Sequence, residues 1–249
     1  MIETTALALA ALIFAAALLY SSVGHAGASG YLMAMALFGL APAVMRPTAL
    51  TLNILVAIIA TWKFWRAGRF SWPLFWPLAL TSIPGAYIGG LVQLPGAWYR
   101  PLLGAVLLYA AWHFLRQPES DARPLKPMPR AAALASGAGI GLLSGLTGVG
   151  GGIFLSPLLL MAGWGHMREV SGVAAAFILV NSVSGLLGVI ANAPALHQVL
   201  PEALPLWALA AVAGGWIGAE YGSRRLKSEI LQRLLAAVLA IAGVKMLVT

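Results

Sequence analysis

Two glycine-rich strings interrupt the apolar stretches of this chain, and they hold residue types that can bind an anion. The first runs from Gly24 to Gly30 (Gly-His-Ala-Gly-Ala-Ser-Gly) and the second from Thr147 to Gly152 (Thr-Gly-Val-Gly-Gly-Gly). Glycine permits sharp turns, and free N–H groups at the start of a helix bind anions without a charged side chain. Small residues also serve as packing surfaces between membrane helices. Because such a break occurs in both halves of the chain, we favour binding.

Polar residues in and near the two strings extend this candidate site. The residues that we expect to bind a substrate are Ser22, Gly24, His25, Gly27, Ser29, Gly30, Asn53, Thr147, Gly148, Gly150, Gly151, Gly152 and Asn181. His25 is the only ionisable residue of the first string, and histidine changes charge near neutral pH. It is therefore a candidate for proton coupling or for pairing with an anion. A neutral histidine bonded to a backbone carbonyl is an equal alternative.

Four further side chains have two interpretations each. Asn53 and Asn181 lie deep in apolar runs, where they either bind substrate or join helices by hydrogen bonds. Arg46 and Arg168 begin equivalent segments of the two halves, and they are candidates for gating or for attracting an anion. Extension of an arginine to the membrane surface is the commoner explanation of such a position.

The residues that most enzymes and metal sites need are missing from the apolar segments. The chain has no Cys, and these segments contain no pair of carboxylates and no His-x-x-x-His spacing. An intramembrane enzyme would need such a constellation. We therefore expect no catalytic residues, no metal and no cofactor.

The composition is that of a membrane protein. Of the 249 residues, 61% are hydrophobic and only 9% are charged, whereas soluble domains carry about 25% charged residues. Several apolar runs approach the roughly 20 residues that a spanning helix needs. The net charge of +8 is explained by basic cytoplasmic loops, so we exclude nucleic acid as a partner.

The sequence contains two copies of one unit. Three pairs of segments match in order: 21–27 with 144–150, 82–90 with 212–219, and 100–107 with 232–239. Such self-similarity indicates an internal duplication. The chain therefore divides into a first repeat, 1–116, a Pro-rich cytoplasmic linker, 117–129, and a second repeat, 130–249.

The order of apolar segments is the same in both halves. Each half has two shorter segments around a break and then three longer ones: 4–20, 28–41, 44–64, 72–92 and 98–115, then 131–146, 152–164, 168–190, 203–222 and 230–248. The excess of Lys and Arg in cytoplasmic loops places 65–71, 116–130, 163–169 and 223–229 inside, and 93–99 and 191–204 outside. This assignment requires the two shorter segments of each half to enter and leave on the same side of the membrane. The second half is then inverted relative to the first, and both termini lie outside.

We therefore predict an all-α polytopic membrane protein of two inverted repeats, each a broken or re-entrant helical hairpin followed by three transmembrane helices. Secondary transporters have this architecture, with the substrate held between the repeats. Backbone that leaves helical geometry inside the bilayer persists only where it lines protein or a water-filled cavity. The sequence thus predicts alternating access around a midplane site between the two breaks.

Two motifs resemble those of a known family. Residues 143–159 (Leu-Ser-Gly-Leu-Thr-Gly-Val-Gly-Gly-Gly-Ile-Phe-Leu-Ser-Pro-Leu-Leu) and 82–90 (Ser-Ile-Pro-Gly-Ala-Tyr-Ile-Gly-Gly) are similar to the signature of the TauE/SafE family of sulfite and organosulfonate exporters. The similarity covers nearly the whole chain. It implies a multi-pass permease of the bacterial inner membrane that exports small sulfur-containing anions such as sulfite or sulfoacetate. The first half departs from the family pattern, because His25 stands within its glycine string.

The expected function is thus secondary transport of a small anion across a lipid bilayer. Protons are a candidate coupling ion, and a second copy of the chain is a candidate partner in a homodimer. A passive anion channel is the alternative within transport, and an intramembrane enzyme is the less favoured alternative from another class. The flux through a channel would neither saturate nor depend on a proton gradient.

Overall fold

The computed structural model describes residues 2–115, 125–192, 200–224, 240–241, 243–244 and 246–248. These described residues form helices joined by turns and loops, without a strand: α1 (Ile2–Ser22), α2 (Ala28–Leu37), α3 (Pro42–Arg66), α4 (Trp72–Leu91), α5 (Gly96–Leu115), α6 (Arg130–Thr147), α7 (Gly152–Ala162), α8 (Met167–Asn192) and α10 (Leu204–Arg224). Most of the predicted last segment, 230–248, and part of the predicted linker, 117–124, lie outside the described residues.

The all-helical, multi-pass class is confirmed. Four of the described helices are long and apolar enough to cross a membrane: Thr4–Ser22, Pro42–Arg66, Trp72–Leu91 and Met167–Asn192. The leading helices are longer than predicted, since α1 has 21 residues and α6 has 18. Only their partners are short: α2 has 10 residues and α7 has 11. At about 1.5 Å per residue, each covers only about half of the roughly 30 Å hydrocarbon layer.

Glycine stripes hold two pairs of helices unusually close. In α10, Gly214, Gly218 and Gly222 face the backbone carbonyls of Phe14, Leu18 and Ser22 in α1. In α6, Gly137, Gly141 and Gly145 face those of Leu78, Ser82 and Ala86 in α4. A side chain at any of these glycines would overlap the facing carbonyl. Residue numbers rise together along both pairs, so the paired helices run parallel. Packing between membrane helices explains these glycines.

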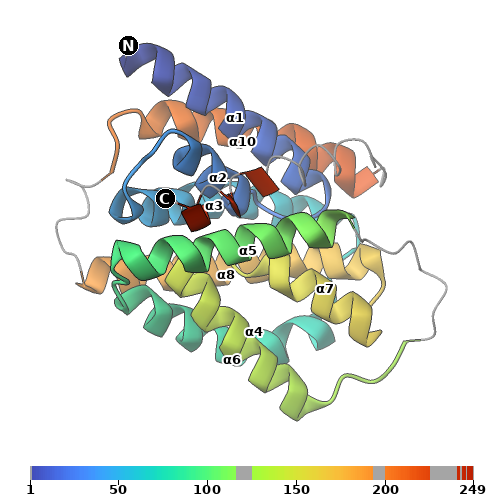
Figure 1. Cartoon of the computed structure of the whole chain (residues 1–249). Coiled ribbons are helices and arrows are strands. Elements are labelled where there is room, and N and C mark those ends of the chain that lie inside the picture. Colours follow the sequence, from blue (N-terminus) through green and yellow to red (C-terminus); the bar gives the residue numbers. More distant parts are fainter. Residues whose placement is uncertain are drawn as a thin grey trace.

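The pairing exchanges helices between the halves of the chain. In Figure 1, α1 from the first half lies beside α10 from the second, whereas α6 from the second half lies beside α4 from the first. Between these pairs, α3 contacts α8. These two helices run antiparallel, because Asn53 bonds to Ser182 while Leu50, earlier in the chain, contacts Gly185, later in the chain. The breaks lie around this central pair.

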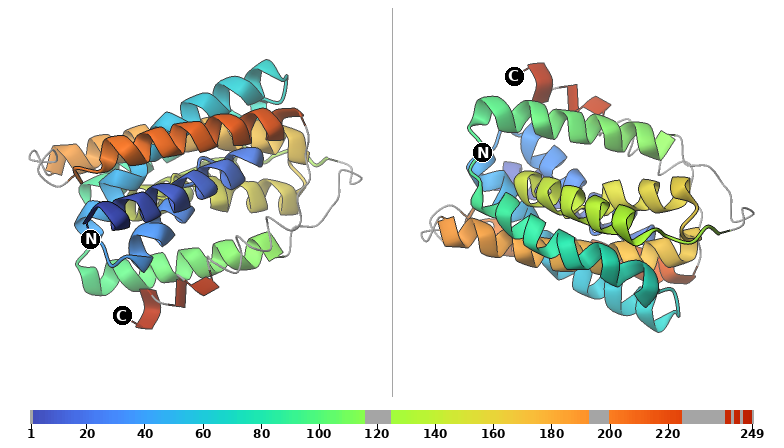
Figure 2. Two further views of the ribbon diagram at one scale, coloured as in Figure 1. Left: turned by 90° about the horizontal axis from the view of Figure 1, so that it is seen from above. Right: turned by 90° about the horizontal axis from the view of Figure 1, so that it is seen from below.

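Helix α5 lies on one side of the molecule (Figure 2). Gly104 of α5 faces Gly243 and Leu247, which belong to the last described residues of the chain. At its start, the Tyr99 hydroxyl donates a 3.0 Å hydrogen bond to the carbonyl of Thr147, at the end of α6. Helix α5 therefore supports the second break from outside the central helices.

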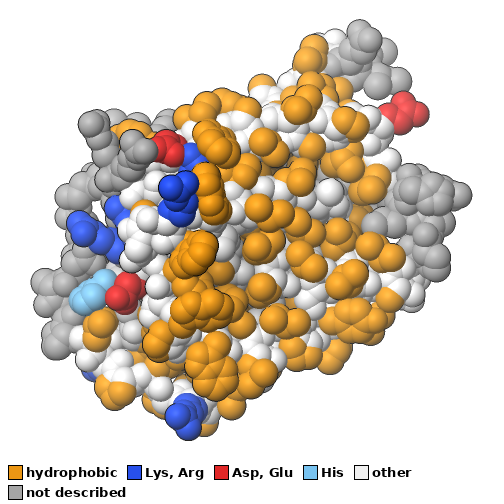
Figure 3. All heavy atoms as spheres, turned by 180° about the vertical axis from the view of Figure 1, so that it is seen from behind, with side chains coloured by type: hydrophobic (Ala, Val, Ile, Leu, Met, Phe, Trp, Pro, Cys, Tyr) orange, Lys and Arg blue, Asp and Glu red, His pale blue; other side chains and the backbone are white. Residues whose placement is uncertain are grey.

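The outer surface suits a lipid environment. Hydrophobic side chains cover most of the face in Figure 3, and most Lys and Arg side chains gather toward one edge. The exposed large side chains of α4 and α10 include Trp76, Leu80, Ile83, Ile88, Leu209, Trp216 and Ile217. A contiguous apolar surface of this kind marks contact with a membrane or partner, and the four spanning helices identify it here as lipid-facing.

Candidate functional site

Each break is built on glycines with left-handed backbone geometry. In the first, Gly24 has φ 81° and Gly27, which precedes α2, has φ 111°. In the second, Gly148 ends α6 with φ 83° and Gly151 precedes α7 with φ 82°. The two breaks therefore correspond as Gly24 to Gly148 and Gly27 to Gly151. This register is one residue later than the sequence comparison, which paired Gly24 with Thr147.

The two breaks meet at His25. Its Nε2 atom lies 3.1 Å from the carbonyl oxygen of Gly152 and 3.2 Å from the hydroxyl of Ser156. Its Nδ1 atom lies 3.3 Å from the carbonyl oxygen of Val23. The side chain is 4% exposed. A residue of the first break thus contacts the start of α7. We call this contact, together with the adjoining second break and the side chains that line it, the junction.

The second break is lined by polar side chains from the two central helices. The Asn53 amide of α3 donates to the Val149 carbonyl at 3.4 Å and to the Ser182 hydroxyl of α8 at 3.2 Å. A Cβ atom at Gly150 would lie 2.5 Å from the Asn53 amide nitrogen and 3.1 Å from the Ser182 oxygen. Because Gly150 has φ +82°, only glycine fits here without strain.

Asn53 also has an unused acceptor. Its side chain is fully buried, and its Oδ1 atom has no hydrogen-bond partner in the described part of the chain. The orientation of the amide follows from its neighbours, because the Val149 carbonyl accepts only from the NH2 group. A buried polar atom without a partner calls for a water or a bound group.

The first break is closed by aromatic side chains of its own hairpin. The Tyr31 hydroxyl donates to the Ala26 carbonyl at 2.5 Å, and the Ser29 hydroxyl donates to the Tyr20 hydroxyl at 2.8 Å. A Cβ atom at Gly27 would lie 2.7 Å from the Tyr31 ring. The Tyr31 and Ser29 hydroxyls therefore bond within 20–31, whereas His25 of the same break bonds to the other half of the chain.

Several predicted site residues bond within their own helices. Ser22 donates to Leu19 at 2.6 Å, Thr147 donates to Leu143 at 2.7 Å, and Asn181 donates to Phe177 at 2.9 Å, in each case to a carbonyl of the preceding turn. Gly24 packs against the backbone of Ser171, and Gly30 packs against Ala16 and Tyr20. These contacts stabilise the helix ends around the junction.

The two predicted arginines differ in role. Arg46 is 7% exposed and donates to the carbonyls of Val92, Gly89 and Gly90 at 2.7, 2.6 and 2.8 Å. It thereby binds the C-terminal end of α4, where a cation is favoured by the helix dipole. Arg168 is exposed at the start of α8. Although they begin equivalent segments, only Arg46 is buried near a break, and its backbone faces Gly148.

Two serines at the junction were not among the predicted site residues. Ser182 lies beside Asn53, and Ser156 lies beside His25. Ser156 follows Gly152 by four residues, so both lie on one face of α7, and this spacing was the available signal. In the described residues, no group of three or more His, Asp or Glu side chains is placed to hold a metal. The junction offers imidazole, amide and hydroxyl groups, which suit reversible binding of a polar solute.

Comparisons with known proteins agree with this architecture. A family model described as "Sulfite exporter TauE/SafE" matches residues 9–246. The chain is 40% identical over 249 residues to the "Probable membrane transporter protein y4hK" of Sinorhizobium fredii (strain NBRC 101917 / NGR234), covering 98% of this chain and 99% of that protein. No solved structure gives a significant match.

Proposed function

The chain belongs to the TauE/SafE sulfite exporter family of membrane transporters, and from that premise we propose that it exports a small sulfur-containing oxyanion. Sulfite, sulfoacetate and related organosulfonates are the proposed cargo, and the bacterial inner membrane is the proposed location. The cargo binds at the junction, beside the second break.

The observation that carries this proposal is the contact between the breaks. His25, from one half, contacts Gly152 and Ser156 from the other, while Asn53 and Ser182 line the same break. Helix α7 begins here without a side-chain cap, and the first N–H groups of a helix have no partner within it. Such N–H groups favour an anion, and the Ser182 hydroxyl, which accepts from Asn53, would complete its coordination as a donor.

Burial of the junction favours a carrier over a channel. His25 is 4% exposed, and Asn53 and Ser182 are fully buried. A cargo can reach them only after helices separate, whereas an open channel needs a continuous pathway. The titratable imidazole at this point supports proton coupling as part of the proposal.

The directions of the helices support the predicted inverted repeats. Helix α3 runs parallel to α10, with Val56 beside Gly215 and Lys63 bonded to Glu220. Helix α4 likewise runs parallel to α8, because Ser184 bonds to Ile83 and Asn192 bonds to Leu91. In the predicted repeats, α3 is equivalent to α8 and α4 to α10. The parallel pair α3–α10 is therefore matched by the parallel pair α8–α4, and the two pairs run in opposite directions. We propose that the units 1–116 and 130–249, joined by 117–129, are inverted repeats. The two tightly packed pairs, α1 with α10 and α4 with α6, then move as bodies that rock against each other about the α3–α8 contact.

Flux measurements on the purified protein in vesicles test this function. We expect saturable uptake of sulfite that exceeds uptake of a carboxylate such as acetate, measured at two pH values with and without a proton gradient. Flux that rises linearly with concentration and ignores the gradient would identify a passive channel. No flux of sulfite or of any sulfonate would refute the proposed cargo.

A matched pair of glycine variants tests the place of binding. Gly150→Val should abolish sulfite uptake, because the side chain would occupy the space beside Asn53 and strain the left-handed backbone. Gly139→Ala in α6 is the control, since a Cβ atom there meets no atom within 4 Å. Unchanged uptake by correctly inserted Gly150→Val protein would remove the second break from the binding site.

A further inference from the structure

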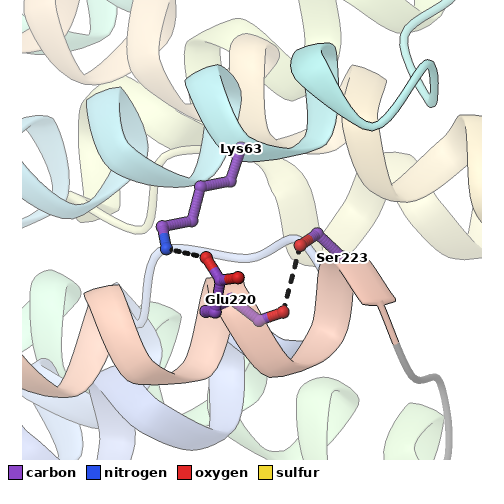
Figure 4. A network of polar contacts seen from close by, with 3 residues as sticks. All are labelled: Lys63, Glu220 and Ser223. Atoms are coloured by element: carbon purple, nitrogen blue, oxygen red, sulfur yellow. Dashed lines mark hydrogen bonds and ion pairs between the residues drawn. The ribbon is translucent and has the colours of Figure 1, made fainter.

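An ion pair between a buried lysine and a partly exposed glutamate joins the two halves at one end of the molecule. Lys63 of α3 forms an ion pair with Glu220 of α10 (Figure 4). The Lys63 side chain is 5% exposed and that of Glu220 is 41% exposed. The Lys63 ammonium also lies 4.0 Å from the centre of the Trp216 ring. Because the Lys63 side chain is buried, loss of Glu220 would leave its charge uncompensated, so this contact favours the packed arrangement.

Other contacts at this end also join α10 to the first half. The Arg69 guanidinium, in the loop after α3, donates to the Gly222 carbonyl at 3.1 Å. Beside the ion pair lies a fully buried cluster of Ala60, Phe64, Ala175 and Ala219, from α3, α8 and α10. The loops after α3 and α10 are both predicted to face the cytoplasm. Polar contacts and an apolar cluster beside them therefore hold α10 against α3 at this end.

We propose that the Lys63–Glu220 pair is the cytoplasmic latch of the transporter, closed in this structure and opened when α10 separates from α3. The proposal rests on the proposed alternating access, because a cargo can enter from the cytoplasm only if these helices part. Glu220, the more exposed partner, becomes solvated as the latch opens, while Lys63 must leave its buried position. Trp216 stabilises the closed state by holding the Lys63 ammonium against its ring.

Thiol labelling measures the latch directly, without any cargo. The chain has no Cys, so Ala175→Cys places a single thiol in the buried cluster beside the latch. A membrane-impermeant maleimide added from the cytoplasmic side should label it slowly. Adding Glu220→Gln or Lys63→Met should raise the labelling rate about tenfold or more. This increase corresponds to a loss of about 1.4 kcal/mol in the free energy that favours the closed state.

Two further variants make the result decisive. Arg66→Gln is the matched control, because Arg66 is a neighbouring cation of α3 that contacts Trp62 of its own helix, and its labelling rate should not change. Exchanging the charges, with Lys63→Glu and Glu220→Lys together, should restore slow labelling even if a single variant folds poorly. Unchanged rates in both single variants, or fast labelling of the exchanged pair, would overturn the latch. If Ala175→Cys protein is labelled slowly, the variants behave as predicted and the protein does not transport sulfite, the latch is supported and sulfite is excluded as the cargo.

Discussion

The two breaks share one backbone design but have different surroundings. Both use left-handed glycines three residues apart, at Gly24 and Gly27 and at Gly148 and Gly151. The first is filled by tyrosines of its own hairpin, whereas the second is met by polar side chains from α3, α8 and the first break. The two breaks therefore share left-handed glycines at the same spacing, while the polar groups contributed by other helices gather at the second break.

This difference separates structural from binding roles among the predicted residues. A hydroxyl that bonds within its own hairpin contributes to stability, and its loss should leave transport intact. An amide or imidazole that bridges between halves contributes to the site, and its loss should reduce transport. The following variants test this distinction, from the largest expected effect to the smallest.

His25→Ala should have the largest effect, because His25 joins the two breaks. Loss of the contacts to Gly152 and Ser156 should remove about 2–3 kcal/mol of cargo binding, which lowers sulfite uptake at low concentration about 30–150-fold. The control is His166→Ala, which removes a histidine of the loop before α8 and should leave uptake unchanged. Equal losses in both variants would contradict a special role of the junction.

The two buried asparagines form a second test. Asn53→Leu should weaken sulfite uptake about tenfold, since it removes about 1–2 kcal/mol of hydrogen bonding at the second break. Asn181→Leu should change uptake little, because its amide donates to the Phe177 carbonyl of the same helix and not to a group of the second break. If the Asn181 variant alone lost uptake, the cargo would bind on the other side of α8.

Tyr31→Phe tests the structural role of the first break. The variant leaves the Ala26 carbonyl without the 2.5 Å hydrogen bond from Tyr31, so the free energy of unfolding should fall by about 1–2 kcal/mol. Denaturant unfolding in detergent measures this loss. Sulfite uptake at temperatures where the protein stays folded should remain normal, and a selective loss of uptake would place the cargo at the first break as well.

Ser22→Ala should have the smallest effect. The Ser22 hydroxyl is half-buried and bonds to the Leu19 carbonyl of its own helix, and such bonds to the preceding turn contribute little. Both uptake and unfolding should match the unmodified protein in the assays above. A strong loss of uptake would return Ser22 to the binding site.

Most helix positions were predictable because the apolar runs are long and separated by glycine, proline or charge. The predicted segments 72–92 and 152–164 correspond to α4 (Trp72–Leu91) and α7 (Gly152–Ala162). The length of α1 was underestimated, because Ser21 and Ser22 continue the helix although they are polar. The lesson is that a hydroxyl bonded to the preceding turn does not end a membrane helix.

The site was only partly predictable because it depends on contacts between distant segments. The sequence indicates the two breaks and His25, but not that Ser156 lies beside this histidine 131 positions away. It also makes the two breaks look equivalent, because the tyrosines that fill the first lie in two ordinary apolar helices, Tyr20 in α1 and Tyr31 in α2. The equivalence of Arg46 and Arg168 likewise concealed that only Arg46 binds the end of α4.

The most direct test of binding at the second break is the dissociation constant of sulfite, measured by calorimetry for two serine variants. Ser182→Ala removes a hydroxyl beside Asn53, and Ser29→Ala removes one bonded to Tyr20 in the first break. We predict that Ser182→Ala weakens binding about fivefold, as expected for about 1 kcal/mol of lost hydrogen bonding, while Ser29→Ala leaves it unchanged. Weaker binding in Ser29→Ala, with normal binding in Ser182→Ala, would contradict the account.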